Sequence, residues 1–422
     1  SVKNTGSEIR IITAFDGDAI RRTLGLILDP ENYQKYRSYL QYKIISANES
    51  YCTMELNELF FNFYQKVLAG QQEQKPEEKR TIGLINHWTG EMMGKIYVAK
   101  YFPESHKNDI MIMIKEILRA MERSIETNDW LTFKTKEKAL IKLSKFNLKI
   151  GYPDQWTDYK DLRISDSDSL HTIAKAVRAW YLKVKFLDLL NTKQDRNEWL
   201  MTPQTVNAYF MPTQNEIVFP AAILQPPFYC KDMNNIQLDI QDELNELNVN
   251  GYDFTDAVNF GGIGAVIAHE ITHGYDDKGR KFDGDGNLND WWTKEDLDLF
   301  EQKTKIMETQ ASGYSFTDPE TLNTYRLNPG LTMGENLADL GGMSLGLQGL
   351  CNRLRERQAS EKETQMNQRV FFKSFANIWK QNTRKDHMIN CLTTDPHSPP
   401  EFRANLVKNI KEFYDVFEVK EN

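Results

Sequence analysis

The spacing of apolar and polar residues is helical along most of the chain, because apolar side chains return every three or four positions and so share one face of a helix. In residues 33–128 this pattern predicts a lobe of helices whose apolar faces pack together as an ordinary core. Ahead of the lobe, a short apolar run at residues 9–15 is predicted to be a strand or a buried turn. Helices are expected at residues 55–68, 81–101, 109–127, 130–149 and 170–191.

The period changes near residue 206, where the pattern becomes that of strands. Residues 206–210 and 216–219 flank the turn-like sequence Met-Pro-Thr-Gln-Asn and are predicted to be two short strands. Residues 231–257 form an acidic, Asn-rich segment that is predicted to be a surface loop. The sequence therefore predicts an α+β fold that is predominantly α-helical.

Residues 259–277 have the apolar pattern of a buried helix but also contain ionisable side chains. An apolar run leads directly into His269, Glu270 and His273, and burying two imidazoles and a carboxylate is costly unless they have partners. The two histidines are four residues apart and therefore project from one helical face. This His-Glu-x-x-His pattern on a helix is typical of zinc peptidases, with the glutamate as general base.

Two histidines leave a catalytic zinc ion short of a third protein ligand. The sequence Gly334-Glu-Asn-Leu-Ala-Asp-Leu-Gly-Gly offers Glu335 and Asp339, again four residues apart on one helical face. We expect Glu335 to bind the metal and Asp339 to accept a hydrogen bond from a ligand histidine. Taken without the motif, the two acids would be interpreted as exposed residues of an ordinary helix; beside the motif, the ligand interpretation is favoured.

Composition narrows the range of partners. The chain has 422 residues, with 40% hydrophobic and 27% charged residues, as in ordinary globular proteins. The net charge of -8 argues against nucleic acid or an anionic membrane surface as the main partner. No run of about 18 apolar residues occurs, so no transmembrane helix is expected within this stretch. The four cysteines are widely spaced, which leaves two disulfides and four free thiols as open alternatives.

Four blocks of sequence, in order, resemble the neprilysin and endothelin-converting enzyme family of zinc metallopeptidases, and the resemblance extends from about residue 35 to the end of the chain. It implies a thermolysin-like catalytic domain over residues 131–422 and part of a helical cap lobe over residues 1–130. The blocks are residues 206–209 with 219–228, then 261–292, 334–342 and 395–403.

The resemblance implies one zinc ion per chain, held by His269, His273 and Glu335. Glu270 would be the general base, and Asp339 would orient a ligand histidine. A zinc peptidase whose third metal ligand is a glutamate is called a gluzincin, and the resemblance implies that this chain is one.

Matching positions also imply substrate contacts. Asn207 and the backbone of Ala208 would hold the substrate peptide as an added strand. His397 would stabilise the oxyanion, and Arg403 would donate a hydrogen bond to a substrate carbonyl on the leaving-group side. The positions that match the family's apolar specificity pocket are Phe228, Val266 and Trp379.

The resemblance implies a zinc endopeptidase that cleaves internal bonds of oligopeptides and prefers an apolar residue on the leaving-group side. The alternatives are a silent relative that acts as a binding protein, and a zinc aminopeptidase. Chains of this family normally begin well upstream, so the missing N-terminal part of the same protein is an expected partner. The resemblance and the sequon at Asn48 favour a secreted or extracellular-facing protein, with an intracellular location left open.

Overall fold

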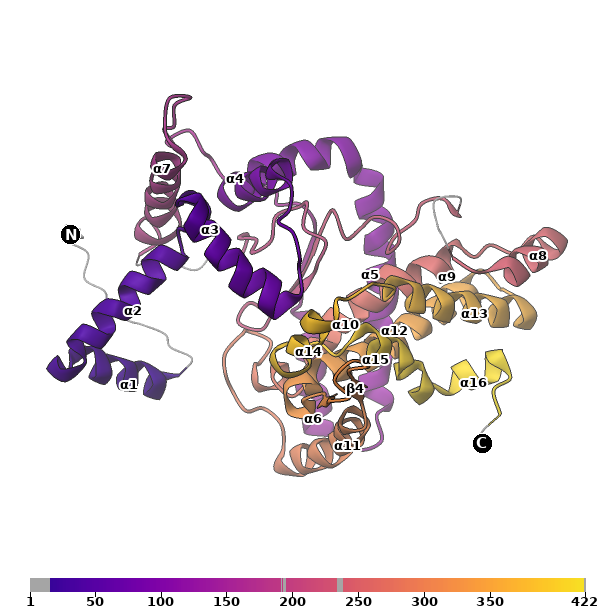
Figure 1. Ribbon diagram of the computed structural model, residues 1–422. Coiled ribbons are helices and arrows are strands. Elements are labelled where there is room, and N and C mark those ends of the chain that lie inside the picture. Colours follow the sequence, from indigo (N-terminus) through magenta and orange to yellow (C-terminus); the bar gives the residue numbers. More distant parts are fainter. Residues whose placement is uncertain (1–15, 191, 193–194, 234–237, 421–422) are drawn as a thin grey trace. The chain divides into compact units, whose positions relative to one another are not determined.

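The computed structural model describes residues 16–190, 192, 195–233 and 238–420 (Figure 1). The chain divides into two compact units, one made of residues 1–89 and 157–196 and the other of residues 90–156 and 197–422. Helix α4 (Glu77–Tyr101) continues from one unit into the other, with non-helical backbone at Thr89. The predicted apolar run at residues 9–15 lies outside the described residues. The domain boundary expected at residue 130 is not tested by these units and stays a prediction.

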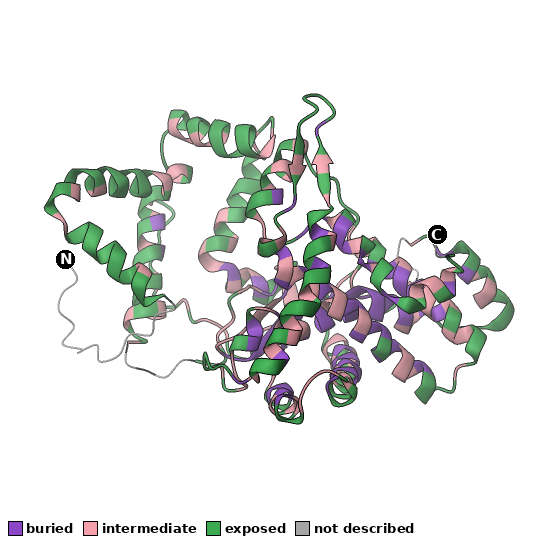
Figure 2. Ribbon diagram, turned by 90° about the horizontal axis from the view of Figure 1, so that it is seen from below, coloured by how far each residue is buried: buried purple, intermediate pink, exposed green. Residues whose placement is uncertain are grey.

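The first unit consists of helices that bury little of their surface, and Figure 2 colours most of them as exposed. None of the residues in the helical segments between Gly17 and Val67 is buried. Besides the start of α4, its helical segments are α1 (Gly17–Leu28), η1 (Pro30–Asn32), α2 (Tyr33–Ser46), η2 (Glu49–Tyr51), α3 (Met54–Phe60), η3 (Phe61–Val67), α7 (Leu170–Leu182) and η4 (Lys183–Leu187).

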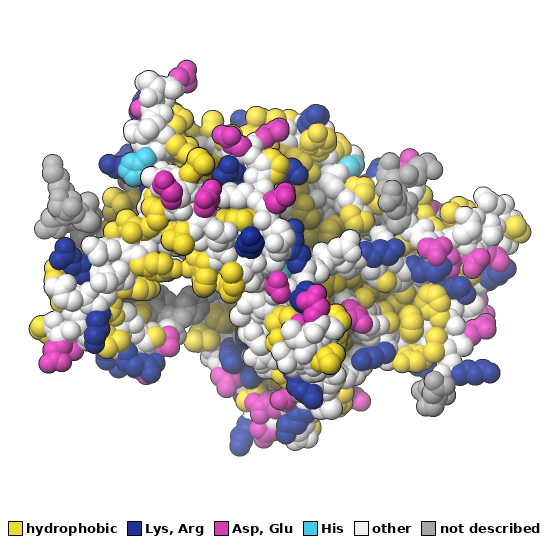
Figure 3. Space-filling view, viewed as in Figure 1, with side chains coloured by type: hydrophobic (Ala, Val, Ile, Leu, Met, Phe, Trp, Pro, Cys, Tyr) yellow, Lys and Arg dark blue, Asp and Glu magenta, His cyan; other side chains and the backbone are white. Residues whose placement is uncertain are grey.

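The predicted helix at residues 55–68 forms as α3 and η3, but the prediction that its apolar stripe packs as core is wrong. Leu59 is 63% exposed, Phe63 53% and Val67 64%. Hydrophobic side chains of this unit are visible on the molecular surface in Figure 3. Leu56 and Phe60 of the same stripe are only half-buried, so the described elements cover this face in part and leave the rest of it exposed.

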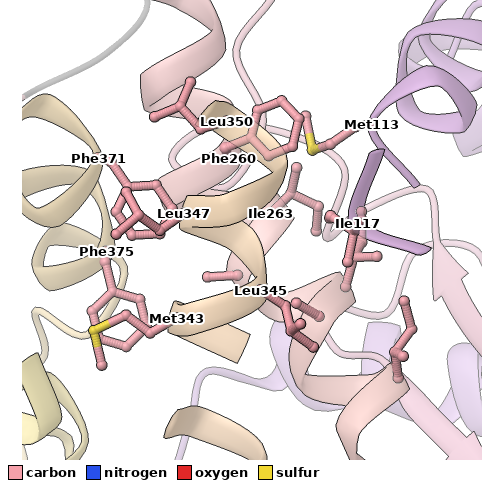
Figure 4. Close-up of a cluster of buried hydrophobic side chains, with 14 of the residues drawn as sticks. Met113, Ile117, Phe260, Ile263, Met343, Leu345, Leu347, Leu350, Phe371 and Phe375 are labelled. Atoms are coloured by element: carbon pink, nitrogen blue, oxygen red, sulfur yellow. The ribbon is translucent and has the colours of Figure 1, made fainter. Parts of the chain in front are cut away.

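The second unit is built around long buried helices. The predicted apolar face of residues 109–127 is confirmed, because Ile110, Ile114 and Ile117 on α5 are fully buried. Figure 4 shows side chains of α5, η6, α12 and α13 meeting in one core. Its helical segments are α5 (Glu104–Thr127), α6 (Phe133–Ser144), α8 (Gln241–Asn250), α9 (Thr255–Asn259), η6 (Phe260–Gly264), α10 (Ala265–His273), η7 (Gly279–Lys281), α11 (Lys294–Ser312), α12 (Pro329–Glu356), α13 (Glu361–Ile378), α14 (Lys385–Thr394), α15 (Pro400–Ala404), η8 (Asn405–Asn409) and α16 (Lys411–Phe417).

A small three-stranded sheet lies in the second unit, in the order β1-β3-β2. The predicted strand pair is confirmed as β2 (Tyr209–Met211) and β3 (Glu216–Pro220), which run antiparallel. The helix predicted for residues 130–149 is wrong at its end, because α6 stops at Ser144 and β1 (Asn147–Gly151) pairs parallel with β3. A short two-stranded sheet is formed by β4 (Ser315–Thr317) and β5 (Thr324–Arg326).

The surface loop predicted for residues 231–257 is also wrong in part, because α8 occupies its middle. The carboxylate of Glu243 is fully buried and lies 3.1 Å from Arg369 Nε and 3.0 Å from Lys373 Nζ of α13. Two cations compensate the desolvation of this carboxylate. The acidic composition therefore favoured a loop in the prediction, although Glu243 of this helix pairs with basic residues of α13 that lie far along the sequence.

In the described part of the chain, no helix is both long and apolar enough to cross a bilayer. All four cysteines are free thiols, which settles the alternative left open by their spacing.

Candidate metal centre

The two motif histidines lie on α10 and point to one spot. Their Nε2 atoms are 3.0 Å apart, and their rings meet at 87°. Residues four apart in an α-helix stand one turn apart on the same face, so this geometry follows from their spacing. His269 is buried and His273 is half-buried, and both line the same cavity.

Glu335 reaches the same spot from α12. Its Oε2 atom lies 3.3 Å from His269 Nε2 and 3.5 Å from His273 Nε2, and one ligand atom from each residue falls within 4.8 Å of the others. The helices approach closely because Gly342 has no side chain, and a Cβ there would lie 2.6 Å from the carbonyl oxygen of Ala265. The structure therefore brings together the three residues predicted as metal ligands.

Each histidine presents its other ring nitrogen to a buried carboxylate. His269 Nδ1 lies 2.8 Å from Asp339 Oδ1, and His273 Nδ1 lies 2.7 Å from Asp276 Oδ2. A carboxylate at Nδ1 fixes the tautomer that leaves Nε2 as a lone-pair donor, which is the usual support for a zinc-binding histidine. Two imidazole nitrogens and one carboxylate oxygen fit a zinc ion that keeps a further position open.

Asp276 is a residue that the sequence analysis missed. It follows His273 by three positions, and this spacing after the motif was the available signal. Burial lowers the pKa of His273, but Asp276 and Glu335 outweigh burial and raise that pKa to about 11. The surroundings therefore favour positive charge between the two rings, as a metal ion would supply.

Arg403 contacts Asp339 directly. Its Nε and Nη2 atoms lie 2.6 Å from the two carboxylate oxygens, and its guanidinium stacks 3.9 Å from the ring centre of Trp379. Burial raises the pKa of Asp339, but Arg403 and His269 lower it to about 2. Asp339 is therefore held as a carboxylate between Arg403 and His269.

Glu270 and His397 also face this spot. Glu270 is buried, and its burial raises the pKa of its carboxyl group against the opposing effect of the two motif histidines. His397 Nε2 lies 3.4 Å from Glu335 Oε2, while His397 Nδ1 lies 2.8 Å from Asp395 Oδ1. His397 can therefore reach a group bound at the three ligand atoms, and Glu270 lines the same cavity.

These residues line a cavity of about 440 Å³. Asn207 and Ala208 line it just ahead of β2, and the amide N–H of Ala208 donates to Asn207 Oδ1 at 2.9 Å. Its apolar wall includes the three predicted pocket residues, and three further apolar residues that the sequence analysis missed. The six are Phe228, Val266, Trp379, Ile223, Phe375 and Ile378.

Comparison with known families agrees with this arrangement. Two family models, both described as peptidase family M13, match residues 7–153 and residues 207–237 with 247–422. The chain belongs to peptidase family M13. The predicted resemblance to neprilysin and endothelin-converting enzyme is thereby confirmed, and with it the expected class of fold.

Curated members of family M13 are similar over nearly the whole of this chain. A neutral endopeptidase of Lactococcus lactis subsp. cremoris is 32% identical over 96% of this chain and 58% of its own length. Endothelin-converting enzyme 1 of Mus musculus is 31% identical over 97% of this chain and 51% of its own length. The chain thus spans little more than half of the length of these M13 relatives.

A solved M13 structure has the same fold. An inhibitor complex of a Mycobacterium tuberculosis zinc metalloprotease superposes with a TM-score of 0.82 at 36% identity, covering 94% of this chain and 57% of that one. Zinc is therefore the metal that family membership implies for the group of His269, His273 and Glu335.

Proposed function

We propose that this chain carries the catalytic centre of a zinc-dependent endopeptidase that hydrolyses internal bonds of oligopeptides. The observation that carries the proposal is the convergence of His269, His273 and Glu335 within 4.8 Å, beside the buried Glu270 in an open cavity. Membership of family M13 supports it, and the names of the relatives are those of endopeptidases.

One zinc ion per chain would be held by His269, His273 and Glu335, with Asp339 and Asp276 orienting the two imidazoles. When bound, zinc polarises a carbonyl and lowers the pKa of water to about 7, which provides a nucleophile at neutral pH. The bidentate contact between Arg403 and Asp339 supports this role, because it prevents Asp339 from turning away from His269.

Glu270 acts as the general base in this proposal. It takes a proton from the water that attacks the scissile carbonyl and passes it to the leaving amine. His397 donates a hydrogen bond from Nε2 to the developing oxyanion, where a fixed donor is most effective. In this role His397 is an imidazolium that donates from both ring nitrogens, and Asp395 supports the assignment because it accepts from Nδ1–H while Nε2–H faces the cavity.

The substrate would add as a strand beside β2, with Asn207 and Ala208 as its backbone partners. The amide of Ala208 bonds to Asn207 Oδ1 at present, so Asn207 would have to rotate to release it. Phe228, Val266 and Trp379 form an apolar pocket suited to an apolar side chain on the leaving-group side. Arg403 would donate to a substrate carbonyl there through the nitrogen that Asp339 leaves free.

The substitution Glu270→Gln tests the proposal most directly. It should leave zinc content near one ion per chain, because Glu270 is not a ligand, and lower kcat for a quenched internal peptide by about a hundredfold or more. Metal content by mass spectrometry and peptide turnover are measured together, with Glu301→Gln on α11 as an exposed control. Unchanged turnover in the zinc-loaded Glu270→Gln chain would remove Glu270 from this role.

Two further outcomes separate the alternatives. A zinc-loaded wild-type chain that binds peptides but cleaves none, with or without chelator, would indicate a silent binding protein. Cleavage that requires a free substrate amine and disappears on N-acetylation would indicate an aminopeptidase. An endopeptidase cleaves the acetylated peptide and loses this activity when zinc is chelated.

A further inference from the structure

The charges that line the metal cavity are almost all paired. Arg403 is held by Asp339, and the motif histidines face Asp339 and Asp276. Among the basic side chains that line the cavity in the described part of the chain, the exception is Lys278, on the turn after α10. Its ammonium group forms no hydrogen bond or ion pair with any side chain in the described ranges of the chain.

The backbone that carries Lys278 is fixed to the metal helix. The amide N–H groups of Lys278 and Gly279 both donate to Asp276 Oδ1, at 2.8 and 2.7 Å, while the other oxygen of Asp276 holds His273. Gly279 sits so close that a Cβ there would lie 1.7 Å from the carbonyl oxygen of His273. The Cα of Lys278 therefore keeps a constant position relative to the ligand histidine.

A second anchor acts on the same turn from α6. The buried ammonium of Lys142 donates to the carbonyl oxygens of Gly274 and Gly279, at 2.5 and 2.8 Å. The turn that bears Lys278 is thus held at both of its ends. The backbone from which the Lys278 side chain extends is therefore fixed, while the exposed side chain itself is free to follow a ligand.

The two ends of α10 lie at different parts of the cavity. Val266 precedes both ligand histidines on α10 (Ala265–His273), whereas Lys278 lies past the end of this helix and is tied to His273 through Asp276. Val266 belongs to the apolar pocket, whereas Lys278 lines the cavity beside Asp276 and Gly279. The pocket end is the leaving-group side in the proposed function, so Lys278 stands on the acyl side.

We propose that Lys278 is a specificity residue that favours substrates with an acidic side chain on the acyl side, close to the scissile bond. This inference rests on the proposed endopeptidase function. An unpaired cation that lines the cavity attracts a carboxylate and repels an ammonium group. The same charge disfavours cleavage next to a free N-terminal amine, which is the opposite of what an aminopeptidase requires.

A set of acetylated, quenched peptides tests the proposal on the zinc-loaded chain. Each has one apolar residue on the leaving-group side and a single Glu, Gln or Lys moved through the three positions before the scissile bond. At the best position, kcat/KM should be about fivefold higher for Glu than for Lys, as expected for a partly exposed ion pair. The preference should weaken as salt is raised.

Charge reversal gives the decisive comparison. The substitution Lys278→Glu should invert the Glu-to-Lys ratio, whereas Lys278→Arg should retain it. The matched control is Lys281→Glu, the same change three residues later at an exposed position that does not line the cavity. A ratio that Lys278→Glu leaves unchanged, or that Lys281→Glu changes equally, would overturn the inference.

Binding separates failure of this inference from failure of the proposed function. Dissociation constants for the Glu and Lys peptides are measured by fluorescence anisotropy on the zinc-loaded Glu270→Gln chain, with and without Lys278→Glu. A Glu preference that inverts supports Lys278 even if wild-type turnover is absent, which would count against the endopeptidase proposal alone. Equal binding of both peptides, or binding of neither, would overturn the role of Lys278.

Discussion

Helices α3 and η3 in the first unit and α5 in the second have the same amphipathic spacing, yet they bury it very differently. Leu59 on α3 is 63% exposed, whereas Ile117 on α5 is fully buried. The helices of the second unit meet α5 with apolar side chains, and α10 and α12 approach each other closely at Gly342. The difference teaches that periodicity identifies the apolar face of a helix and leaves open what covers it.

The largest test of this comparison truncates one apolar residue in each region. Ile117→Ala should lower the free energy of unfolding of the second unit by about 2–5 kcal/mol, because it opens a cavity in a closely packed core. Leu59→Ala should change the stability by less than about 0.5 kcal/mol, because its side chain already meets solvent. Urea unfolding followed by circular dichroism measures both, and a large cost at Leu59 would show that its face is covered in solution.

A second test compares two carboxylates that each face a basic group. Asp276→Asn should weaken zinc binding by about ten- to a hundredfold, because the amide supports His273 less well than a carboxylate does. Asp18→Asn on α1, where Asp18 and Arg21 are 76% and 81% exposed, should leave zinc affinity unchanged. Competition with a fluorescent chelator gives both constants, and equal affinity for Asp276→Asn and wild type would contradict the positioning role.

The smallest expected effect concerns two acids at helix starts, one in the first turn of α11 and one at the N-cap of α1. Asp296 at the start of α11 is fully buried and accepts hydrogen bonds from Thr132 and Thr293, at 2.6 Å from each hydroxyl. Burial raises the pKa of Asp296, but these hydrogen bonds outweigh it and lower the pKa. Because the folded pKa lies below the unfolded value, the stability from this carboxylate is present above about pH 4 and is lost as the pH falls through the folded pKa.

Asp296→Asn should therefore cost about 1 kcal/mol at pH 7, and the difference from wild type should shrink below pH 4. Asp16→Asn, at the exposed cap of α1, should cost less at pH 7, because Asn caps a solvated helix nearly as well. Thermal unfolding at pH 3 to 7 measures both variants. A difference that persists unchanged at pH 3 would show that the charge of Asp296 is not the cause.

The metal group could be predicted from sequence because its spacing is local. His269 with His273, and Glu335 with Asp339, each occupy one helical face, and the need of a catalytic zinc ion for a third ligand linked the two helices. Asp276 was missed because it lies beyond the helix, where only the turn geometry brings its carboxylate to His273.

The errors outside the site share a different cause. Strand β1 was taken for the end of a helix because its partner β3 lies far along the sequence. Helix α8 was taken for a loop because the two cations that compensate Glu243 come from α13. In both cases the local structure depends on a segment that is distant in sequence. A short window of sequence around β1 or α8 does not contain that segment.

Strand β2 lies at the edge of its sheet, and this has a consequence for self-association. An exposed edge that can accept a peptide can in principle pair with another copy of the same chain. Here β2 is only three residues long, and Asn207 covers the amide of Ala208 at its start. In the proposed function, such a brief edge would bind a short extended peptide, while it gives another copy of the chain few hydrogen bonds with which to pair.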